Sequence, residues 1–479
     1  MSEKSFVSQK SRVPFAVIRV TKFLRQMLSN RLALAGTFFL LLFVFVAVAA
    51  PLLTPYSPQG TIVSGNLAAP SWVKYIYGDR GLSQNANFAD ITASSVGGVT
   101  LTPTAQGTDS IDLKVSSTLG GRVLVQESLN YPYSGPPTRF KGSFSIQPVG
   151  TTTNAVVNAT VSVVRLDSVG RVLQQYPLRT QQVDTSMAAS GSIDSQDQSI
   201  VQSLGIQGVS TPAQYVFSAP APYNYVLEMT LPAGFHGEFL VQTFTLQLQG
   251  NTWGLLGTDD IGQDIFTQFV YGSRLSLYVG LIATFIGVGL GLVVGLMAGY
   301  LGKVVDETLM RFTDMMLVIP ALPLLIVLSF VLGPNLNTIV LILGFLGWMG
   351  FARLIRSQVL SLRERPFIES AKASGAGTTY ILTKHIFPNI IALTYVNLAL
   401  SVPAAVVGEA ALSFLGLGDQ NVITWGRMLD LAHSAGSATG LSWWWIIPPG
   451  IGIAVLSLSF ILIGYSLDEL FNPRLRRRR

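Results

Sequence analysis

The sequence predicts an all-α membrane protein of six transmembrane helices, with an extracellular β-sandwich-like domain inserted between helices 1 and 2. Three observations support this fold class. The 479-residue chain is 49% hydrophobic and only 12% charged, with a mean hydropathy of +0.47, which is too apolar for an ordinary soluble protein. Long apolar runs lie before residue 54 and after residue 275. Between them, residues 57–252 are rich in Ser, Thr, Gln, Gly and Pro and carry few charges.

Composition and charge placement exclude several classes of protein. The chain has no cysteine, which excludes disulfides, thiol catalysis and cysteine-based metal sites. Its net charge of +6 would suit a nucleic-acid-binding protein, but the basic residues gather at the two ends and after Met349. That placement is typical of a membrane protein with cytoplasmic termini, because Lys and Arg are retained on the inner side. Nucleic-acid binding is therefore not expected.

Residues 1–31 form a basic tail that we place in the cytoplasm, and residues 32–56 follow as the first transmembrane helix. The apolar run Leu32–Leu53 is long enough to cross about 30 Å of hydrocarbon. Ala47–Ala49 resembles a signal-peptidase site, but the leader and the apolar run are both longer than in a usual signal peptide. We therefore expect an uncleaved helix.

Residues 57–252 are predicted to form the β-sandwich-like domain. Apolar and polar residues alternate in several runs, as in strands with one buried face, and the apolar members include Val157, Ala159, Val161, Val163, Tyr223, Tyr225, Phe244, Leu246 and Leu248. The tyrosines could stack on a sugar, but alternating tyrosines more often belong to a core. Because one crossing separates the domain from the basic tail, we expect it outside the cell. There Asn158-Ala159-Thr160 offers a glycosylation sequon.

Residues 253–275 are predicted to lie at the outer membrane interface. Thr258 is expected to cap a helix, with Asp259 and Asp260 in its first turn, where the backbone amides of a helix favour negative charge. A Ca²⁺ site that also includes Asp264 is the alternative.

Residues 276–467 are predicted to hold helices 2 to 6, at Ser276–Tyr300, Phe312–Leu332, Leu336–Phe351, Ile390–Leu415 and Trp445–Leu467. Pro320 and Pro323 interrupt the third helix, where they either bend it or help to form a pathway. Four glycines recur at every fourth position of the second helix, namely Gly287, Gly291, Gly295 and Gly299. They predict a bare ridge against which a neighbouring helix packs closely, as association in lipid requires. Residues 468–479 close the chain as a basic cytoplasmic tail.

A cytoplasmic loop, residues 353–389, is predicted between the fourth and fifth helices because arginines precede it. Pro366 suits the first position of a helix, and Glu369 falls in its first turn. Gly375 and Gly377 then break that helix. Thr378 is expected to cap a second short helix that ends at Pro388, which predicts two short helices joined by a glycine elbow.

This loop resembles the EAA loop of permease subunits of prokaryotic ABC importers. The residues that carry the resemblance are Glu369, Ser370, Ala371, Gly375, Ile386, Phe387 and Pro388. Ser370 replaces the first alanine of that pattern and Phe387 replaces a leucine, and both changes keep the size or the apolar character. The resemblance implies that the loop docks on an ATPase subunit. The alternative is a simple connecting loop on the cytoplasmic surface.

Two further segments are similar to the C-type subunits of the dipeptide, oligopeptide and nickel permeases. They are Gly257–Leu277, where Gln263 and Gln268 replace the usual arginines, and Glu409–Gly418. The resemblance covers about residues 32–72 and 253–474. It implies a subunit that pairs with a second homologous permease and with two cytoplasmic ATPase subunits, and that receives substrate from an extracytoplasmic binding protein. ATP and Mg would bind the ATPase subunits, so no cofactor is expected in this chain.

Glu409 lies in the predicted fifth helix. A charged residue at membrane depth costs on the order of 2 to 3 kcal/mol on insertion scales, so its side chain should face water or a partner inside the bundle. A structural hydrogen bond and a place along the substrate path both meet this requirement.

The chain itself is predicted to be non-catalytic. Gly302-Lys303 is followed by Val304 and lacks the pattern of a phosphate loop. The three histidines, His236, His385 and His433, form no metal-ligand or triad pattern.

We therefore expect a multi-pass cell-membrane subunit with both termini in the cytoplasm, forming half of a translocation pathway for oligopeptides. Oligosaccharides such as short β-glucans are the alternative substrate. A secondary transporter would use charged residues at mid-membrane, which are scarce here apart from Asp314. A membrane-anchored surface receptor would leave five crossings without a purpose.

Overall fold

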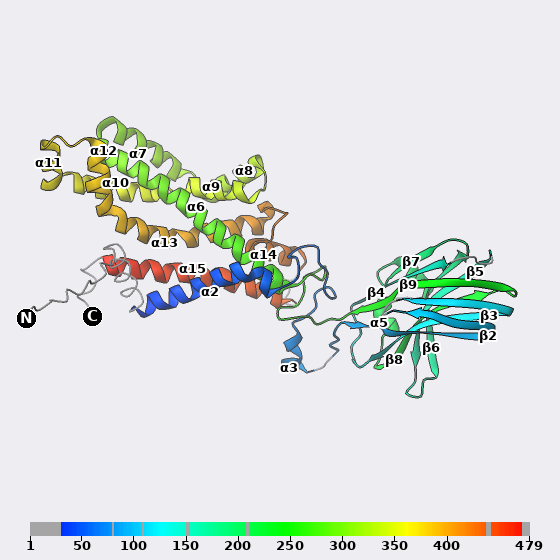
Figure 1. Ribbon diagram of the computed structural model, residues 1–479. Helices are drawn as coiled ribbons and strands as arrows, with labels where there is room; N and C mark the ends of the chain where they lie inside the picture. The colour runs from blue at the N-terminus through cyan, green and yellow to red at the C-terminus, as the bar shows by residue number, and fades with distance from the viewer. Residues whose placement is uncertain are drawn as a thin grey trace, which may run out of the picture. The chain divides into compact units, whose positions relative to one another are not determined.

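The computed structural model of the protein describes residues 30–78, 81–107, 110–149, 154–206, 210–436 and 442–471. The chain divides into two compact units, one formed by Met1–Gln59 with Thr267–Arg479 and the other by Gly60–Phe266. We call them the helical unit and the β-rich unit (Figure 1). The predicted basic tails fall outside the described residues, except for residues 30–31 and 468–471.

Within the described residues, the helical unit has five helical stretches that are long and apolar enough to cross a membrane. They are Arg31–Leu53 (α2), Ile265–Leu301 (α6), Leu336–Arg363 (α9, Leu336–Leu346, with α10, Met349–Arg363), Thr378–Leu417 and Trp443–Phe471 (α15). The stretch Thr378–Leu417 joins α12 (Thr378–Ile381), a π-helical turn (Leu382–Ile386), α13 (Phe387–Leu412) and a second π-helical turn (Ser413–Leu417). Their apolar surfaces make the chain a multi-pass membrane protein.

The predicted third helix is not a single span. It consists of α7 (Lys303–Val318) and α8 (Ala321–Leu332), which are bent by 88° relative to each other. Ile319 has an extended backbone, because the ring of Pro320 disfavours helical geometry in the residue before it. If this pair counts as one broken span, the described residues contain six crossings.

Several helices continue beyond the apolar runs that predicted them. Helix α6 begins at Ile265 rather than at Ser276, and the stretch that contains α13 begins at Thr378 rather than at Ile390. Hydropathy locates only the part of a helix that lies in hydrocarbon. The first turns of α6 contain Thr267 and Gln268, which are polar but fully buried by packing, so the helix extends into a region where hydropathy gives no signal.

Trp425 is a packing centre of the helical unit. It begins α14 (Trp425–Ser434), a short helix that the sequence did not predict, and its side chain is fully buried. Its ring stacks on Phe269 of α6 and meets Phe43 of α2 edge to face. Its indole N–H donates a hydrogen bond to the carbonyl oxygen of Phe269 at 3.0 Å. One side chain therefore ties α14 to both α2 and α6.

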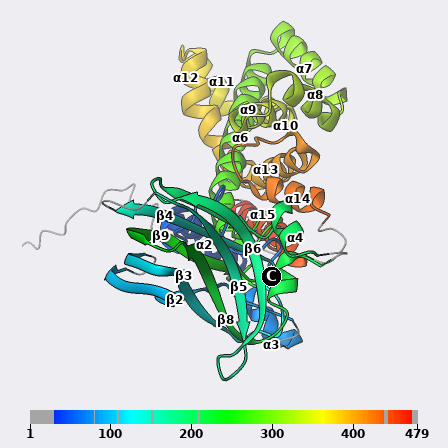
Figure 2. The ribbon, with the colours of Figure 1, turned by 90° about the vertical axis from the view of Figure 1, so that its right-hand side faces the viewer.

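The β-rich unit contains nine strands, all paired antiparallel, among its described residues. They are β1 (Ala86–Asn87), β2 (Ala89–Gln106), β3 (Ile111–Tyr131), β4 (Arg139–Val149), β5 (Val156–Leu166), β6 (Val172–Asp184), β7 (Ala189–Asp194), β8 (Ala221–Leu231) and β9 (Phe235–Gln249). The strand order is β6-β5-β8-β3-β9-β4-β7, with β2 beside β3 and β1 beside β9. Figure 2 shows β3, β8, β5 and β6 side by side. Two short helices, α4 (Gln198–Ser203) and α5 (Pro212–Val216), lie between β7 and β8 in the chain.

The sandwich is one continuous hydrogen-bonded sheet that folds over its own core. Strand β3 makes this possible because residues 111–117 pair with β9 while residues 121–131 pair with β8. The change of partner occurs at Gly120, whose φ of +83° suits a bend that other residues rarely adopt. The two halves of the sheet face each other, since Tyr225 of β8 stacks on Phe244 of β9 with ring centroids 4.5 Å apart. Tyr223 and Tyr225 are fully buried, as expected for core residues.

The predicted helix cap at Thr258 is wrong. Helix α6 begins at Ile265, and the hydroxyl of Thr258 instead accepts a hydrogen bond from the backbone N–H of Ala68 at 2.7 Å and donates one to the carbonyl oxygen of Gly65 at 2.6 Å. Asp259 accepts hydrogen bonds from two backbone N–H groups of its own turn. The segment is thus a loop held to residues 65–68. No group of three or more His, Cys, Asp or Glu side chains that could hold a metal was found among the described residues.

Candidate functional site

We call residues 366–389 of the predicted cytoplasmic loop the coupling segment. It begins with α11 (Pro366–Ala373), at one end of the helical unit, whereas α14 lies at the opposite end (Figure 1). Pro366 occupies the start of the helix and Glu369 its first turn, as predicted. The hydroxyl of Ser370 donates a hydrogen bond to the carbonyl oxygen of Pro366 at 2.9 Å. The helix ends at Ala373, and Gly375 follows with a φ of +84° that reverses the chain.

The second half of the segment differs from the prediction. Gly377 is the cap of α12 and Thr378 is its first residue, and the helix does not end at Pro388 but runs on into the membrane span. The π-helical turn explains the continuity. The backbone N–H of Phe387 donates to the carbonyl oxygen of Leu382, five residues back, and Pro388, which has no N–H to donate, follows directly as the second residue of α13.

The buried face of the coupling segment packs into an apolar cluster. Ile368, Ile381 and Ile386 are fully buried and pack with residues of α10 and α6, which include Ile355, Val359 and Val288. Ala371 packs against the same cluster. The cluster therefore joins α11, α12 and the π-helical turn to α10.

The opposite face of the coupling segment is exposed and surrounds an open groove of about 660 Å³. Small residues form much of its lining, including Ser370, Ser374, Gly375 and Gly377, while the larger side chains are Phe367, Tyr380 and His385. The His385 ring lies 5.7 Å from that of Tyr380 and 6.3 Å from that of Phe367. The sequence indicated Ser370 and Gly375 as coupling residues, but it did not indicate that these three rings meet.

The predicted coupling residues therefore divide between the two faces. Glu369, Ser370, Gly375 and Pro388 are exposed, Ala371 is half-buried and Ile386 is buried.

Tyr300, near the end of α6, is tied to the coupling segment from two sides. The Lys372 ammonium of α11 lies 5.5 Å from the centre of the Tyr300 ring, a cation–π contact. The Arg363 guanidinium of α10 donates a hydrogen bond to the carbonyl oxygen of Tyr300 at 3.3 Å and so caps the end of α6. Neither contact was predicted from the sequence, because no local pattern marks contacts between residues so far apart in the chain.

The four ridge glycines of α6 all face α9 and α10. A Cβ atom built at Gly287 would lie 3.1 Å from the carbonyl oxygen of Gly344. At Gly291 and Gly295 it would lie 2.6 Å from the carbonyl oxygens of Trp348 and Ala352, and at Gly299 it would lie 2.7 Å from the Cβ atom of Val359. The distances at Gly291, Gly295 and Gly299 are shorter than real Cβ atoms show, and the one at Gly287 is tighter than in most real contacts, so α6 packs closely against α9 and α10. Two ion pairs, Arg356 with Asp306 and Arg353 with Asp314, join α10 to α7.

Glu409 is buried near the end of α13, with 1% of its surface exposed. Its Oε1 accepts hydrogen bonds from the hydroxyls of Ser413 and Thr424, both at 2.7 Å. Thr424 is also the cap of α14, since its hydroxyl accepts from the backbone N–H of Arg427. The carboxyl group thus joins α13 to α14, which is the structural role foreseen for it. Its place along a substrate path stays a prediction.

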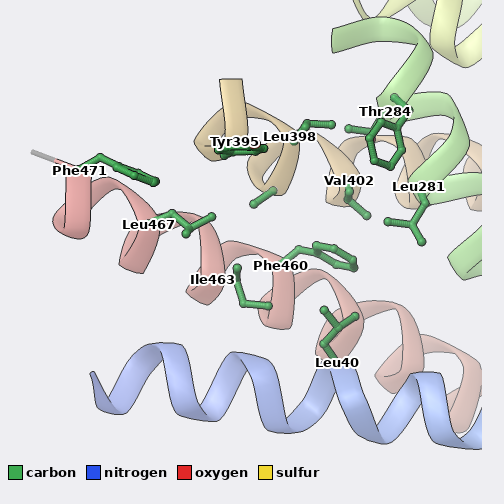
Figure 3. Close-up of a pocket in the computed structure, with 12 residues that line it drawn as sticks. Leu40, Leu281, Thr284, Tyr395, Leu398, Val402, Phe460, Ile463, Leu467 and Phe471 are labelled. Carbon is green, nitrogen blue, oxygen red and sulfur yellow. The ribbon is translucent and has the colours of Figure 1, made fainter. Parts of the chain in front are cut away.

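The helical unit also contains two cavities that share Thr284 of α6 as a lining residue. The larger, of about 550 Å³, lies between α2, α6, α13 and α15 and is almost entirely apolar (Figure 3). Its polar lining residues are Thr284 and Tyr395. The smaller, of about 280 Å³, lies among α6, α8, α9 and α13 and is lined largely by small residues, with Ser401 and Gly408 on α13. Thr284 lines both cavities.

Comparison with known proteins identifies the family. The model of the binding-protein-dependent transport system inner membrane component matches residues 291–477, and that of the N-terminal TM domain of oligopeptide transport permease C matches residues 21–70. The dipeptide transport system permease protein DppC of Bacillus subtilis (strain 168) is 38% identical over 224 residues, which cover 46% of this chain and 69% of that protein. The oligopeptide transport system permease protein OppC of the same organism is 35% identical over 222 residues, covering 46% and 72%.

Among solved structures, a chain of the MetNI methionine ABC transporter in an inward-facing conformation has a TM-score of 0.33 at 20% identity, covering 43% of this chain and 94% of that chain.

Family membership rules out the secondary-transporter and receptor hypotheses and makes the chain a non-catalytic transport component. These relatives give no support to the oligosaccharide alternative. The chain belongs to the binding-protein-dependent inner membrane components, as a permease subunit of an ABC importer in the group of the dipeptide and oligopeptide permeases.

Proposed function

We propose that this chain is one of two permease subunits of an ATP-driven importer of di- or oligopeptides, and that α11 with its glycine elbow docks on a cytoplasmic ATPase subunit. The observation that carries the docking proposal is the groove. One face of the segment packs against the membrane spans, and the other is exposed and has a groove lined largely by small residues. A groove of this kind suits a partner that inserts a side chain. The peptide substrate is supported by the relatives, which are named for dipeptides and oligopeptides.

The partners follow from the same proposal. A second homologous permease completes the translocation pathway, two ATPase subunits bind ATP and Mg, and an extracytoplasmic binding protein delivers the substrate. The exposed apolar side chains of α8, such as Phe330 and Val331, suit contact with lipid or with the second permease.

Contacts between helix ends support the proposed topology. The hydroxyls of Thr54, just after α2, and Thr267 of α6 lie 2.6 Å apart, so α2 ends where α6 begins. The side chain of Asn30, at the start of α2, donates a hydrogen bond to Glu469 near the end of α15 at 2.9 Å. The start of α2 and the end of α15 therefore share a membrane side with Tyr300 and the coupling segment. We place both termini in the cytoplasm and residues 57–252 outside the cell.

The proposed mechanism has two states. ATP binding and hydrolysis move the ATPase subunits together and apart, and the coupling segment is carried with them as a rigid body. Its motion reaches α10 through the buried isoleucines and α6 through Lys372 and Tyr300. Reversing a strongly biased equilibrium between the two states takes about 5 kcal/mol of binding free energy that favours one state over the other. Bound nucleotide can supply this difference only if the coupling segment is firmly docked on the ATPase subunit.

Blocking the groove tests the docking proposal. Ser370 lines the groove, whereas Ala373 is exposed on the same helix but does not line it, so Ser370→Trp and Ala373→Trp form a matched pair. We expect Ser370→Trp to lose copurification of the ATPase subunit and ATP-dependent peptide uptake while still inserting into the membrane. Ala373→Trp should keep both. Equal copurification by the two variants would contradict docking at the groove.

A further inference from the structure

We infer that the β-rich unit carries a membrane-anchoring patch, formed by Trp72, Tyr75, Ile76 and Leu255, which inserts into the head-group region of the bilayer. We call these four residues the basal patch. The inference requires only that α6 crosses a membrane. It does not depend on the proposed substrate or on the docking of an ATPase.

The basal patch exposes large apolar and aromatic side chains. Tyr75 is 81% exposed, Ile76 65%, Leu255 59% and Trp72 36%. The first three of these values are high for residues that gain free energy when they leave water. The patch lies on η1 (Ser71–Val73) and α3 (Lys74–Tyr77) and on the loop that precedes α6.

Hydrogen bonds hold the two parts of the patch together. The indole N–H of Trp72 donates to the carbonyl oxygen of Leu255 at 2.8 Å. The backbone N–H of Ser71 donates to the carbonyl oxygen of Gly254 at 3.0 Å. Residues 71–76 are therefore held beside the loop around residue 255.

That loop is in turn fixed to the start of a membrane span. Leu255 and Ile265 are ten positions apart in the sequence, which limits their separation to about 35 Å even in an extended chain. The actual path is shorter, because the backbone N–H of Ile265 donates to the carbonyl oxygen of Gly257 at 3.1 Å and Thr258 binds the backbone of residues 65 and 68. Helix α6 has 37 residues, about 55 Å, and exceeds the hydrocarbon thickness, so its ends project into the interface. The basal patch is thus within reach of the head groups.

The chemistry of the basal patch fits lipid. Trp and Tyr are enriched at membrane interfaces because their rings are amphipathic, and Lys keeps its charge in water while its stem lies along apolar surface. Lys74 is present here, with its ammonium 5.2 Å from the centre of the Tyr75 ring. Elsewhere in the unit, the exposed Leu119 within β3 and Val169 between β5 and β6 are single aliphatic residues without this mixture.

Single-cysteine labelling tests the inference in the full-length protein, since the native sequence contains no cysteine. We would place a fluorescent label at Tyr75→Cys, at Ile76→Cys and, as a control of matched exposure, at Leu119→Cys. Each variant would be reconstituted in phosphatidylcholine vesicles with and without lipids that carry a quencher near the head group. All three positions are exposed, so none of the changes should prevent folding.

We expect the labels at positions 75 and 76 to be quenched severalfold more strongly by these lipids than the label at position 119. Equal quenching at 75, 76 and 119 would overturn the inference. Shielding of positions 75 and 76 from a water-soluble quencher that requires added binding protein would also overturn it, because the patch would then be a protein-docking surface.

Discussion

Gly295 of α6 and Ala352 of α10 touch along their backbones, so closely that a Cβ atom at position 295 would lie 2.6 Å from the carbonyl oxygen of Ala352. This contact belongs to a ridge of four glycines that runs from Gly287 to Gly299. Because lipid already solvates apolar side chains, close packing of this kind holds membrane helices together. The ridge therefore fixes the position of α10, which leads directly into the coupling segment.

Replacing Gly295 by alanine should destabilise the helical unit by about 1 to 3 kcal/mol, because the added methyl group forces the two helices apart. Gly289→Ala, on the same helix, is the control, since a Cβ atom there would have no neighbour within 4 Å. Thermal unfolding of both variants in the same detergent checks this. A Gly295→Ala protein as stable as Gly289→Ala would show that the ridge is not a tight contact.

Gly375 should be essential for uptake but not for membrane insertion. Its φ of +84° disfavours a β-branched residue, so Gly375→Val should distort the elbow and abolish transport, whereas Gly375→Asn should retain much of it because asparagine tolerates this backbone region. Uptake into proteoliposomes, with the amount of inserted protein as a control, measures the effect. Unaltered transport by Gly375→Val would count heavily against a coupling role for this segment.

Glu409 should tolerate glutamine better than leucine. Glutamine keeps an oxygen that can accept hydrogen bonds from Ser413 and Thr424, whereas leucine leaves two buried hydroxyls without that acceptor and should cost about 1 to 3 kcal/mol. Thermal unfolding compares the two variants. Should both lose the same stability, the buried hydrogen bonds would not be what Glu409 contributes.

The β-rich unit should lose stability in acid, because protonation of Asp194 removes a stabilising contribution of its carboxylate. Burial alone would raise the pKa of its carboxyl group, but the hydrogen bond from Arg139, with the backbone N–H of Gln196 and the charges of Arg139 and Lys141, holds that pKa below the ordinary 3.8. A lowered folded-state pKa contributes stability that is present above the unfolded value of 3.8 and is lost as the pH falls through the folded value.

Hydrogen exchange of β4 and β7 in the full-length protein measures this loss. We expect protection to be constant above about pH 5 and to fall as the pH drops below 4, and Arg139→Gln should weaken that dependence. Arg122→Gln, which removes a more exposed ion pair with Glu228, is the control and should change little. The same pH profile for Arg139→Gln and the native protein would contradict the assignment.

Much of the fold could be predicted from the sequence because hydropathy and strand alternation act locally. The apolar runs indicated the helices, and the alternation around Val161 and Tyr225 indicated strands whose apolar face is buried. Helix ends were predicted less well, since α6 begins among polar residues that are buried by packing.

The remaining differences arise from contacts between distant residues or from backbone geometry without a sequence signature. Thr258 has the residue type of a helix cap, but the nearby backbone of Ala68 and Gly65 satisfies its hydroxyl instead. The π-helical turn at Leu382–Ile386 allowed a helix to continue through a proline that suggested its end. At the candidate site, the sequence indicated coupling residues such as Ser370 and Gly375, but not the rings of Phe367, Tyr380 and His385 that line the same groove.

Photocrosslinking from position 380 is the most direct test of the central claim, that the coupling segment docks on an ATPase subunit. Tyr380 is exposed beside the groove, so a photoreactive phenylalanine analogue can replace it in the assembled importer, with Met187, an exposed residue of the β-rich unit, as the control position. We predict an adduct with the ATPase subunit from position 380 and none from position 187. No ATPase adduct at 380, or an adduct there with the extracytoplasmic binding protein, would contradict the account.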